Sequence, residues 1–383
     1  MDVYSFNSNY WSNLDIAPIN QTIHRKSNKL GKTFKQMLSN LWIISPIISL
    51  FCGILVILSI RLFDFIEVEP IKVLRSSLLA GILTIIPILS AYDYTEFIWL
   101  NIFNLDPATI ENISTFIDAP IIEEVIKGLA LLIIFKIFKS EFDTLTDYII
   151  YACCVAIGFA FVENTFYLWG NIDPGNSSLW LQELTYRVID KASMHLLFSV
   201  WIGVALWIWI ETKIKYKSAF VFCSFSLSIV LHFINNIATI TEYFPVEYMS
   251  NLIYVSNQQL ALALFIFLIL LSISLDYSYL YKYLIYLQKY ALDKSEVNDT
   301  KEEFFNKITY LICPTNILKL NLIDLVPRRF TPNNKRSKGI THRKLAKLSF
   351  AFNKELRENN NGVNKDSSSY IKQGIELINS MNV

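Results

Sequence analysis

The chain is 383 residues long, with 53% hydrophobic residues, 17% charged residues and a formal net charge of +1. Soluble globular proteins carry about a quarter charged residues. Here the apolar residues gather between residues 41 and 276, so the composition excludes an ordinary soluble protein. The five cysteines include no CxxC pair and no framework in the loops, so the sequence supports neither a disulfide scaffold nor a thiolate zinc site. No motif points to nucleic acid, and no nucleic-acid partner is expected.

Seven apolar stretches approach the length of about 20 residues that an α-helix needs to cross a bilayer. Open strands are excluded there, because unpaired backbone groups cannot be satisfied in lipid. The sequence therefore predicts an all-α, polytopic transmembrane bundle of about seven spans, at residues 41–60, 74–92, 119–138, 147–169, 188–210, 219–241 and 253–275. The short apolar stretch Tyr94–Leu105 is expected to be interfacial or re-entrant.

Polar segments flank the bundle on both sides. The expected divisions are a polar N-terminal segment at 1–40, the transmembrane bundle at 41–276 with its functional core at about 117–240, and a basic C-terminal tail at 277–383. Within the tail, 301–313 and 341–356 have the pattern of amphipathic helices, and 358–369 has the composition of a disordered segment. The tail is therefore expected to be partly helical and partly disordered.

The distribution of lysine and arginine predicts the orientation of the bundle. Basic residues occupy the tail and the loops after the third and fifth expected spans, whereas the loops at 93–118, 170–186 and 242–252 contain none. This pattern places the tail in the cytoplasm and those three loops outside. Residues 1–40 hold five basic residues between Arg25 and Lys35 but fall outside on this count. Either one span is miscounted or this segment departs from the rule.

Ionisable residues inside the spans are the strongest functional signal, because each costs about 3 kcal/mol on insertion scales. The third span has two adjacent glutamates with a lysine one turn later, the fourth has a glutamate, the fifth opens with a basic face that includes a histidine, and the sixth pairs a histidine with an asparagine at i, i+4. These residues are Glu123, Glu124, Lys127, Glu163, Arg187, Lys191, His195, His232 and Asn236. We expect Lys127 and Arg187 to be structural counter-charges.

Four of these side chains are expected at a similar depth. Glu124, Glu163, His195 and His232 fall roughly 8–14 Å below the outer surface, at a rise of about 1.5 Å per residue. They belong to four different spans. One polar cavity in the outer half of the bilayer is the simplest arrangement that accounts for this.

Two chemistries suit such a cavity, and the residues leave both open. In the first, His195 and His232 bind a zinc ion with a carboxylate, Glu163 or Glu124, and leave one position for water. In the second, which needs no metal, a glutamate pair activates water while a histidine and Asn236 polarise the carbonyl. In both, the expected catalytic residues are Glu123, Glu124, Glu163, His195, His232 and Asn236, and the expected metal ligands in the first are Glu163, His195 and His232.

The motifs in this region resemble those of the PrsW family of intramembrane proteases, which is related to the CAAX-protease and bacteriocin-processing group. Four motifs occur in order over residues 117–240: EExxK, D-x10-GFAxxEN-x2-Y, R-x7-H-x7-G and H-x3-N. The matching residues are Glu123, Glu124, Lys127, Asp147, Gly158, Phe159, Ala160, Glu163, Asn164, Tyr167, Arg187, His195, Gly203, His232 and Asn236. Tyr148 stands where the family commonly has glycine, and Asn236 where it commonly has aspartate.

The resemblance implies an intramembrane endopeptidase in the bacterial cytoplasmic membrane, often catalogued as a metalloprotease. It also implies a membrane-protein substrate, since a family member cuts a membrane-bound anti-sigma factor on its outer side. Two other functions stay open from the residues alone. One is a proton- or ion-coupled transporter, because buried Glu and His also form proton relays. The other is a catalytically inactive receptor or scaffold that recruits partners through the basic tail.

Overall fold

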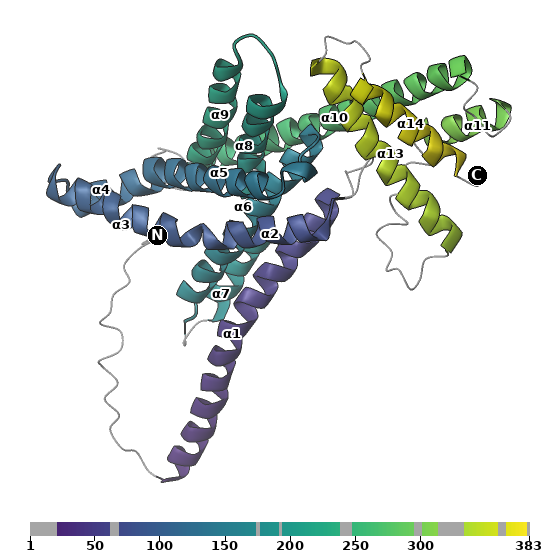
Figure 1. The fold of residues 1–383 in the computed structure, drawn as a ribbon. Helices are drawn as coiled ribbons and strands as arrows, with labels where there is room; N and C mark the ends of the chain where they lie inside the picture. Colours follow the sequence, from purple (N-terminus) through teal and green to yellow (C-terminus); the bar gives the residue numbers. More distant parts are fainter. Residues whose placement is uncertain are drawn as a thin grey trace.

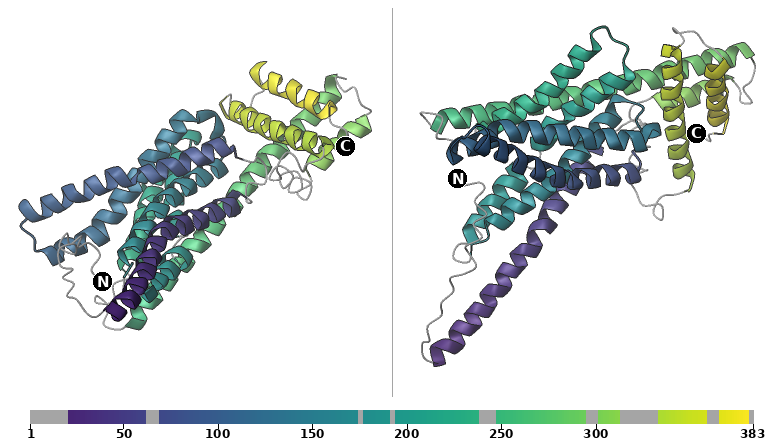
Figure 2. Two further views of the ribbon diagram at one scale, coloured as in Figure 1. Left: turned by 90° about the horizontal axis from the view of Figure 1, so that it is seen from below. Right: turned by 60° about the vertical axis from the view of Figure 1, so that its left-hand side comes forward.

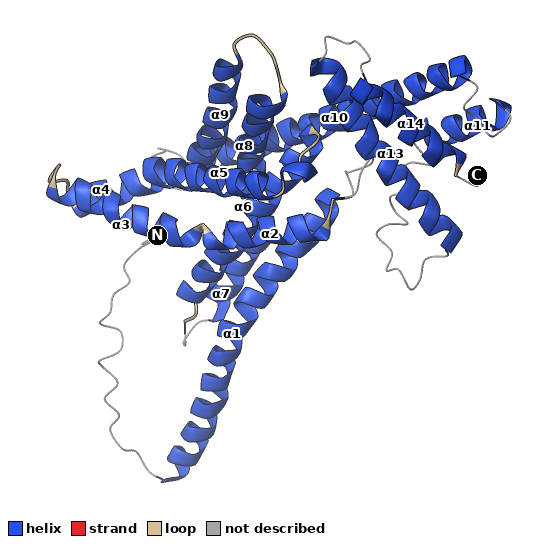
Figure 3. Ribbon diagram, in the orientation of Figure 1, coloured by secondary structure: helices blue, strands red, loops and turns tan. Residues whose placement is uncertain are grey.

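The computed structural model describes residues 21–61, 69–173, 177–190, 194–237, 247–294, 301–312, 333–358 and 365–380. These residues form helices and short connections, and none of them lies in a strand (Figure 3). The all-α prediction is confirmed. Residues 1–20, Lys191 and the basic stretch at 313–332 lie outside the described residues.

Six spans are long and apolar enough to cross a membrane, which confirms the polytopic prediction. They lie in α1 (Gln21–Arg61), in α2 (Ile71–Leu83) together with α3 (Ile85–Asn101), and in α6 (Leu145–Gly170), α8 (Met194–Glu211), α9 (Lys217–Ile237) and α10 (Glu247–Lys294). The third expected span corresponds to α5 (Ala119–Ile137), which carries too many charged residues to count among the six. Because α3 continues to Asn101, most of the stretch expected to be interfacial prolongs the second span.

Short elements connect these helices. They are α4 (Pro107–Ile113), the π-helix η2 (Ser114–Asp118), the 3₁₀-helix η3 (Lys139–Glu141), α7 (Ser177–Leu184) and the π-helix η4 (Thr185–Asp190). The π-helix η2 lies directly before α5, and η4 is the last described element before α8; these two α-helices carry three of the expected site residues. Such wide turns are rare and frequently occur at functional sites.

Helix α6 is the centre of the bundle. Every residue from Leu145 to Ala160 is buried, and α1, α2 and α8 pack around it (Figure 1). Its middle consists largely of Ala, Cys, Val and Gly. Small residues allow backbones to approach closely, and this close packing stabilises helix association in lipid.

Gly158 in α6 makes one of these close approaches, and replacing it tests the packing. A Cβ there would lie 2.1 Å from the carbonyl oxygen of Leu78 in α2. We expect Gly158→Ala to destabilise the fold by about 1–3 kcal/mol, because the backbone of α2 has to shift. The control is Gly170→Ala at the end of the same helix, where a Cβ meets nothing within 4 Å. Equal unfolding free energies for the two variants in detergent micelles would contradict this packing.

The tail helices form a second core at one end of the bundle. Helices α11 (Lys301–Ile312), α13 (Asn333–Glu358) and α14 (Lys365–Asn379) pack with the last turns of α10, around residues such as Leu284, Leu287 and Phe352 (Figure 2). The two expected amphipathic helices correspond to α11 and α13. Helix α14 begins at Lys365, inside the stretch expected to be disordered. Its apolar face is covered by this core, which local composition does not indicate.

We call the side of the bundle that faces this second core the tail end. Two loops expected in the cytoplasm meet the tail there. Thr146 donates a hydrogen bond to Asp276 in α10 (2.5 Å). Lys347 and Lys354 of α13 pair with Glu141 after α5 (2.7 Å) and Glu211 at the end of α8 (3.1 Å). These contacts bring the loops after α5 and α8 to the same side of the bundle as the tail.

Asp143 in the loop at the tail end makes stability depend on pH. Burial, reinforced by the charge of Asp147, raises the pKa of the Asp143 carboxyl to about 7. Because the folded protein holds this proton more tightly than the unfolded chain, the stabilisation is full below about pH 4 and is lost as pH rises through 7. We expect Asp143→Asn to flatten the fall in unfolding free energy between pH 5 and pH 8. The exposed Asp93→Asn is the control, and an unchanged pH profile in Asp143→Asn would contradict this.

Candidate functional site

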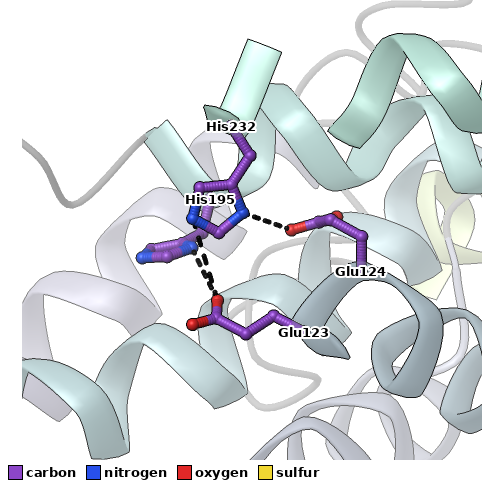
Figure 4. A group of neighbouring side chains, drawn as sticks. All are labelled: Glu123, Glu124, His195 and His232. Atoms are coloured by element: carbon purple, nitrogen blue, oxygen red, sulfur yellow. Dashed lines mark hydrogen bonds and ion pairs between the residues drawn. The ribbon is translucent and has the colours of Figure 1, made fainter. Parts of the chain in front are cut away.

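The expected site residues converge at the opposite end of the bundle from the tail. Glu123 and Glu124 lie near the start of α5, His195 is the second residue of α8, His232 lies near the end of α9, and Glu163 lies in the last third of α6. Pro120 occupies the first turn of α5, a position that favours helix initiation. Figure 4 shows Glu123, Glu124, His195 and His232 pointing toward one another.

Glu124 is fully buried and is held on both carboxylate oxygens. The hydroxyls of Ser199 and Ser228 donate to Oε2, at 2.7 and 2.8 Å. Lys127 Nζ donates to Oε1 at 2.9 Å, and Nδ1 of His232 lies 3.2 Å from the same oxygen. A carboxylate with this many partners is fixed in place and keeps its negative charge next to Lys127. Glu124 therefore orients the groups around it.

His195 is oriented by Glu163. Its Nε2 lies 2.6 Å from Glu163 Oε2, and Arg187 contacts the other oxygen of Glu163 at 3.5 Å. The guanidinium of Arg187 in turn stacks on the ring of Tyr167, 3.2 Å from its centroid. A carboxylate at Nε2 places the ring proton there, so Nδ1 is the nitrogen without a proton, called the free nitrogen below, and Lys127 Nζ lies 3.4 Å from it.

His232 is oriented in the same manner by Glu124. With the proton on Nδ1 toward Glu124, its Nε2 is the free nitrogen. The two histidine rings stand nearly perpendicular, with centroids 5.3 Å apart. The ring of Phe198 stacks on His232 at 5.1 Å. The two imidazoles thus present free nitrogens to one space, and each ring is held on its far side by a carboxylate, half-buried Glu163 for His195 and buried Glu124 for His232.

Glu123 faces that space. Its Oε2 lies 3.9 Å from Nδ1 of His195 and 3.9 Å from Nε2 of His232. The hydroxyl of Tyr92 in α3 donates to the other oxygen, Oε1, at 2.8 Å. Lys127 Nζ lies 3.3 Å from Oε2 and 3.4 Å from His195 Nδ1. Glu123 is therefore the carboxylate between the two free imidazole nitrogens.

This donor set is chemically suited to a transition metal. One ligand atom from each of Glu123, Glu124, His195 and His232 lies within 4.8 Å of the others. Zinc binds imidazole nitrogen and carboxylate oxygen at about 2.0–2.2 Å, so tetrahedral ligands stand about 3.3–3.5 Å apart. The 3.9 Å separations around Glu123 need only a small contraction to reach that value. The carboxylates behind both histidines match the outer partners usual for metal-binding imidazoles.

Asn236, expected in the site with the two histidines, binds the backbone before α5. Its side-chain nitrogen donates to the carbonyl of Thr115 (3.0 Å), inside the π-helix η2. Asn236 therefore fastens the end of α9 to the turn that precedes the two glutamates. Tyr148, the other departure from the family motifs, is buried beside Phe142 (4.9 Å between ring centroids).

Three residues of the site were absent from our prediction: Tyr92, Ser199 and Ser228. A helical pattern could have found the serines. Ser199 follows His195 by four residues and Ser228 precedes His232 by four, so each shares a helix face with its histidine. Tyr92 gives no such signal, because it lies in a different span.

Comparison with known proteins agrees with the site. A family model described as PrsW family intramembrane metalloprotease matches residues 69–271. Protease PrsW of Oceanobacillus iheyensis is 29% identical over 169 residues, which are 44% of this chain and 70% of that protein. Protease PrsW of Geobacillus kaustophilus is 27% identical over 180 residues, 47% of this chain and 72% of that protein. No solved structure matches this chain.

The matched region contains every residue placed in the site and leaves out the tail. The sequence resemblance is thus confirmed by a match over more than half of the chain. The multi-pass membrane location is confirmed as well, and so is the function as a protease rather than a transporter. The chain belongs to the PrsW family of intramembrane metalloproteases.

Proposed function

We propose that this protease is zinc-dependent and that His195 Nδ1, His232 Nε2 and Glu123 Oε2 hold the ion. The observation that supports this most is the position of Glu123 Oε2, 3.9 Å from each free imidazole nitrogen. Two histidines, one carboxylate and an open position for water are the usual ligands of a catalytic zinc ion. We expected Glu163 as the carboxylate ligand. It lies behind His195, and Glu123 takes its place in this proposal.

When bound, a zinc ion supplies a Lewis acid that polarises the scissile carbonyl and favours deprotonation of the attacking water. The remaining roles belong to the chain. Glu163 and Glu124 hold the protons of His195 and His232 on the far side of each ring. Glu123 would be the carboxylate ligand that lies beside the attacking water, with its Oε1 held by Tyr92. Lys127 gives up its contact with His195 Nδ1 and stays paired with Glu124, balancing one negative charge.

The substrate, in this proposal, is a membrane protein cut near the face opposite the tail end. All the site residues lie within about nine residues of that end of their helices, which is about 14 Å at 1.5 Å per residue. With the tail in the cytoplasm, this is the outer half of the bilayer. An anti-sigma-factor-like substrate follows from the family resemblance and is part of the proposal.

The test compares the N-termini of membrane proteins in the native host. Three strains are matched for protein level: wild type, Glu123→Gln, and Glu96→Gln, which makes the same chemical change at an exposed position of α3. We expect one or a few cut ends, close to the outer membrane face, in the wild type and in Glu96→Gln. These ends should be missing in Glu123→Gln. The same ends in all three strains would reject the proposal, and cut ends on the cytoplasmic side would reject its orientation.

A further inference from the structure

Helix α3 carries two polar aromatic side chains on the face that it turns toward α5. Tyr92 and Trp99 are seven residues apart and so lie on one side of the helix. The indole of Trp99 donates to Asp118 Oδ2 (2.9 Å), and the hydroxyl of Tyr92 donates to Glu123 Oε1 (2.8 Å). The other side of α3 is exposed, as at Tyr94 with 66% of its surface accessible. The helix thus presents one hydroxyl to the site.

The hydroxyl of Tyr92 makes the two oxygens of Glu123 unequal. Oε1 accepts the Tyr92 hydrogen bond, while Oε2 faces both histidines at 3.9 Å. A hydrogen bond from a hydroxyl to a carboxylate is charge-assisted and stronger than a neutral one. It therefore opposes rotation of the carboxylate toward Lys127, whose Nζ lies 3.3 Å from Oε2.

We infer that Tyr92 is a positioning residue that presents Oε2 of Glu123 to the reacting space. This inference rests on the proposed function, in which Glu123 Oε2 would bind the ion. Outer hydrogen bonds to a metal-binding carboxylate typically contribute 10- to 100-fold to metal affinity or activity. Tyr92 thus extends the site to a helix that contributes no residue to the four motifs.

The position of helix α3 in the bundle does not depend on the Tyr92 hydroxyl. Trp99 anchors the helix to Asp118 near its far end, and Ile88 is fully buried one turn before Tyr92. The ring of Tyr92 also remains when only its oxygen is removed. Tyr92→Phe therefore deletes the bond to Glu123 and leaves the helix in place.

The experiment compares Tyr92→Phe with Tyr94→Phe, which removes one hydroxyl from the exposed side of the same helix. Cobalt(II) is titrated into metal-free, full-length protein in detergent, and its ligand-field absorption reports binding. We expect Tyr92→Phe to weaken cobalt binding by about 10- to 100-fold, and to lower kcat for the host substrate while leaving KM unchanged. Tyr94→Phe should match wild type. The same cobalt affinity in both variants would overturn the inference.

Two further variants separate this inference from the proposed function. If Glu123→Gln binds cobalt as wild type does, Glu123 is not a ligand, and the proposed function fails together with the role of Tyr92. If Glu123→Gln loses cobalt while Tyr92→Phe keeps it, only the inference about Tyr92 fails. Trp99→Phe removes the anchor to Asp118 and keeps the Tyr92 hydroxyl. If Trp99→Phe loses as much cobalt affinity as Tyr92→Phe, the loss comes from a shift of helix α3 and not from the Tyr92 hydroxyl, and the inference is overturned.

Discussion

Removing bound metal from the purified enzyme is expected to reduce cleavage by about a thousand-fold, and added zinc is expected to restore it. Polarising a carbonyl and activating water through a metal ion is worth several kcal/mol of transition-state stabilisation, and each 1.4 kcal/mol is about tenfold in rate. The assay uses the host substrate identified from its cut ends, in detergent or vesicles, with metal content measured on the same sample.

The control for this prediction is the same chelator saturated with zinc before use, which keeps its bulk and charge but cannot extract the ion. Circular dichroism before and after treatment reports whether the helices persist. Full activity in protein that retains less than a tenth of an equivalent of metal would contradict zinc dependence. It would favour the alternative without a metal, in which a glutamate pair activates water while a histidine and Asn236 polarise the carbonyl.

Replacing the two adjacent glutamates by glutamine, one at a time, is expected to have different effects: a loss of activity at Glu123 and a loss of stability at Glu124. Glu123→Gln should lower cleavage by about a thousand-fold or more, with little change in unfolding free energy, because its Oε2 faces the reacting space. Glu124→Gln should lower the unfolding free energy by about 2–5 kcal/mol, because a buried charge that balances Lys127 is lost. Unfolding in detergent micelles and cleavage of the host substrate are measured on both variants.

A matched variant at the same buried carboxylate checks the second half of this contrast. Ser228→Ala removes one hydroxyl donor from Glu124 and leaves the charge intact. It should destabilise by about 1.5–3 kcal/mol, the usual contribution of a hydrogen bond to a charged group. If Glu124→Gln proves as stable as wild type and inactive, Glu124 would be the carboxylate that meets the water and the assignment of Glu123 would be wrong.

Local patterns in the sequence were sufficient to predict the spans and most of the polar site. Hydropathy marks a helix because one chain segment of about 20 residues must cross the lipid by itself. Helical spacing then places Lys127 near both glutamates and His232 beside Asn236 on one face. Both signals depend only on neighbours along the chain. This is why the all-α bundle and the set Glu123, Glu124, His195 and His232 could be predicted together.

The different roles of the three glutamates in the site depend on contacts between helices, and the sequence does not reveal these contacts. Glu123 and Glu124 are neighbours in the chain but point about 100° apart around α5. One therefore meets Tyr92 and the free imidazole nitrogens, and the other meets Ser199 and Ser228. For the same reason Glu163 was expected as a ligand, although it lies behind His195.

The tail illustrates a similar limit. The apolar stripes of α11 and α13 predict amphipathic helices, but not that α10 extends beyond the bundle to supply their partner. Helix α14 begins in a polar, asparagine-rich region whose composition suggests disorder. Its order follows from burial of Ile371, Ile375 and Ile378 in the second core, a tertiary contact.

The most direct test of the central claim is a zinc-edge X-ray absorption spectrum of the purified, full-length protein. The account predicts about one ion per chain, with two imidazole nitrogens and carboxylate or water oxygens at about 2.0–2.2 Å. Substituting His195 by alanine should reduce the imidazole contribution from two to one, or abolish binding. Protein that cleaves its substrate without bound zinc, or zinc whose nearest ligands include no imidazole, would contradict the site described at His195, His232 and Glu123.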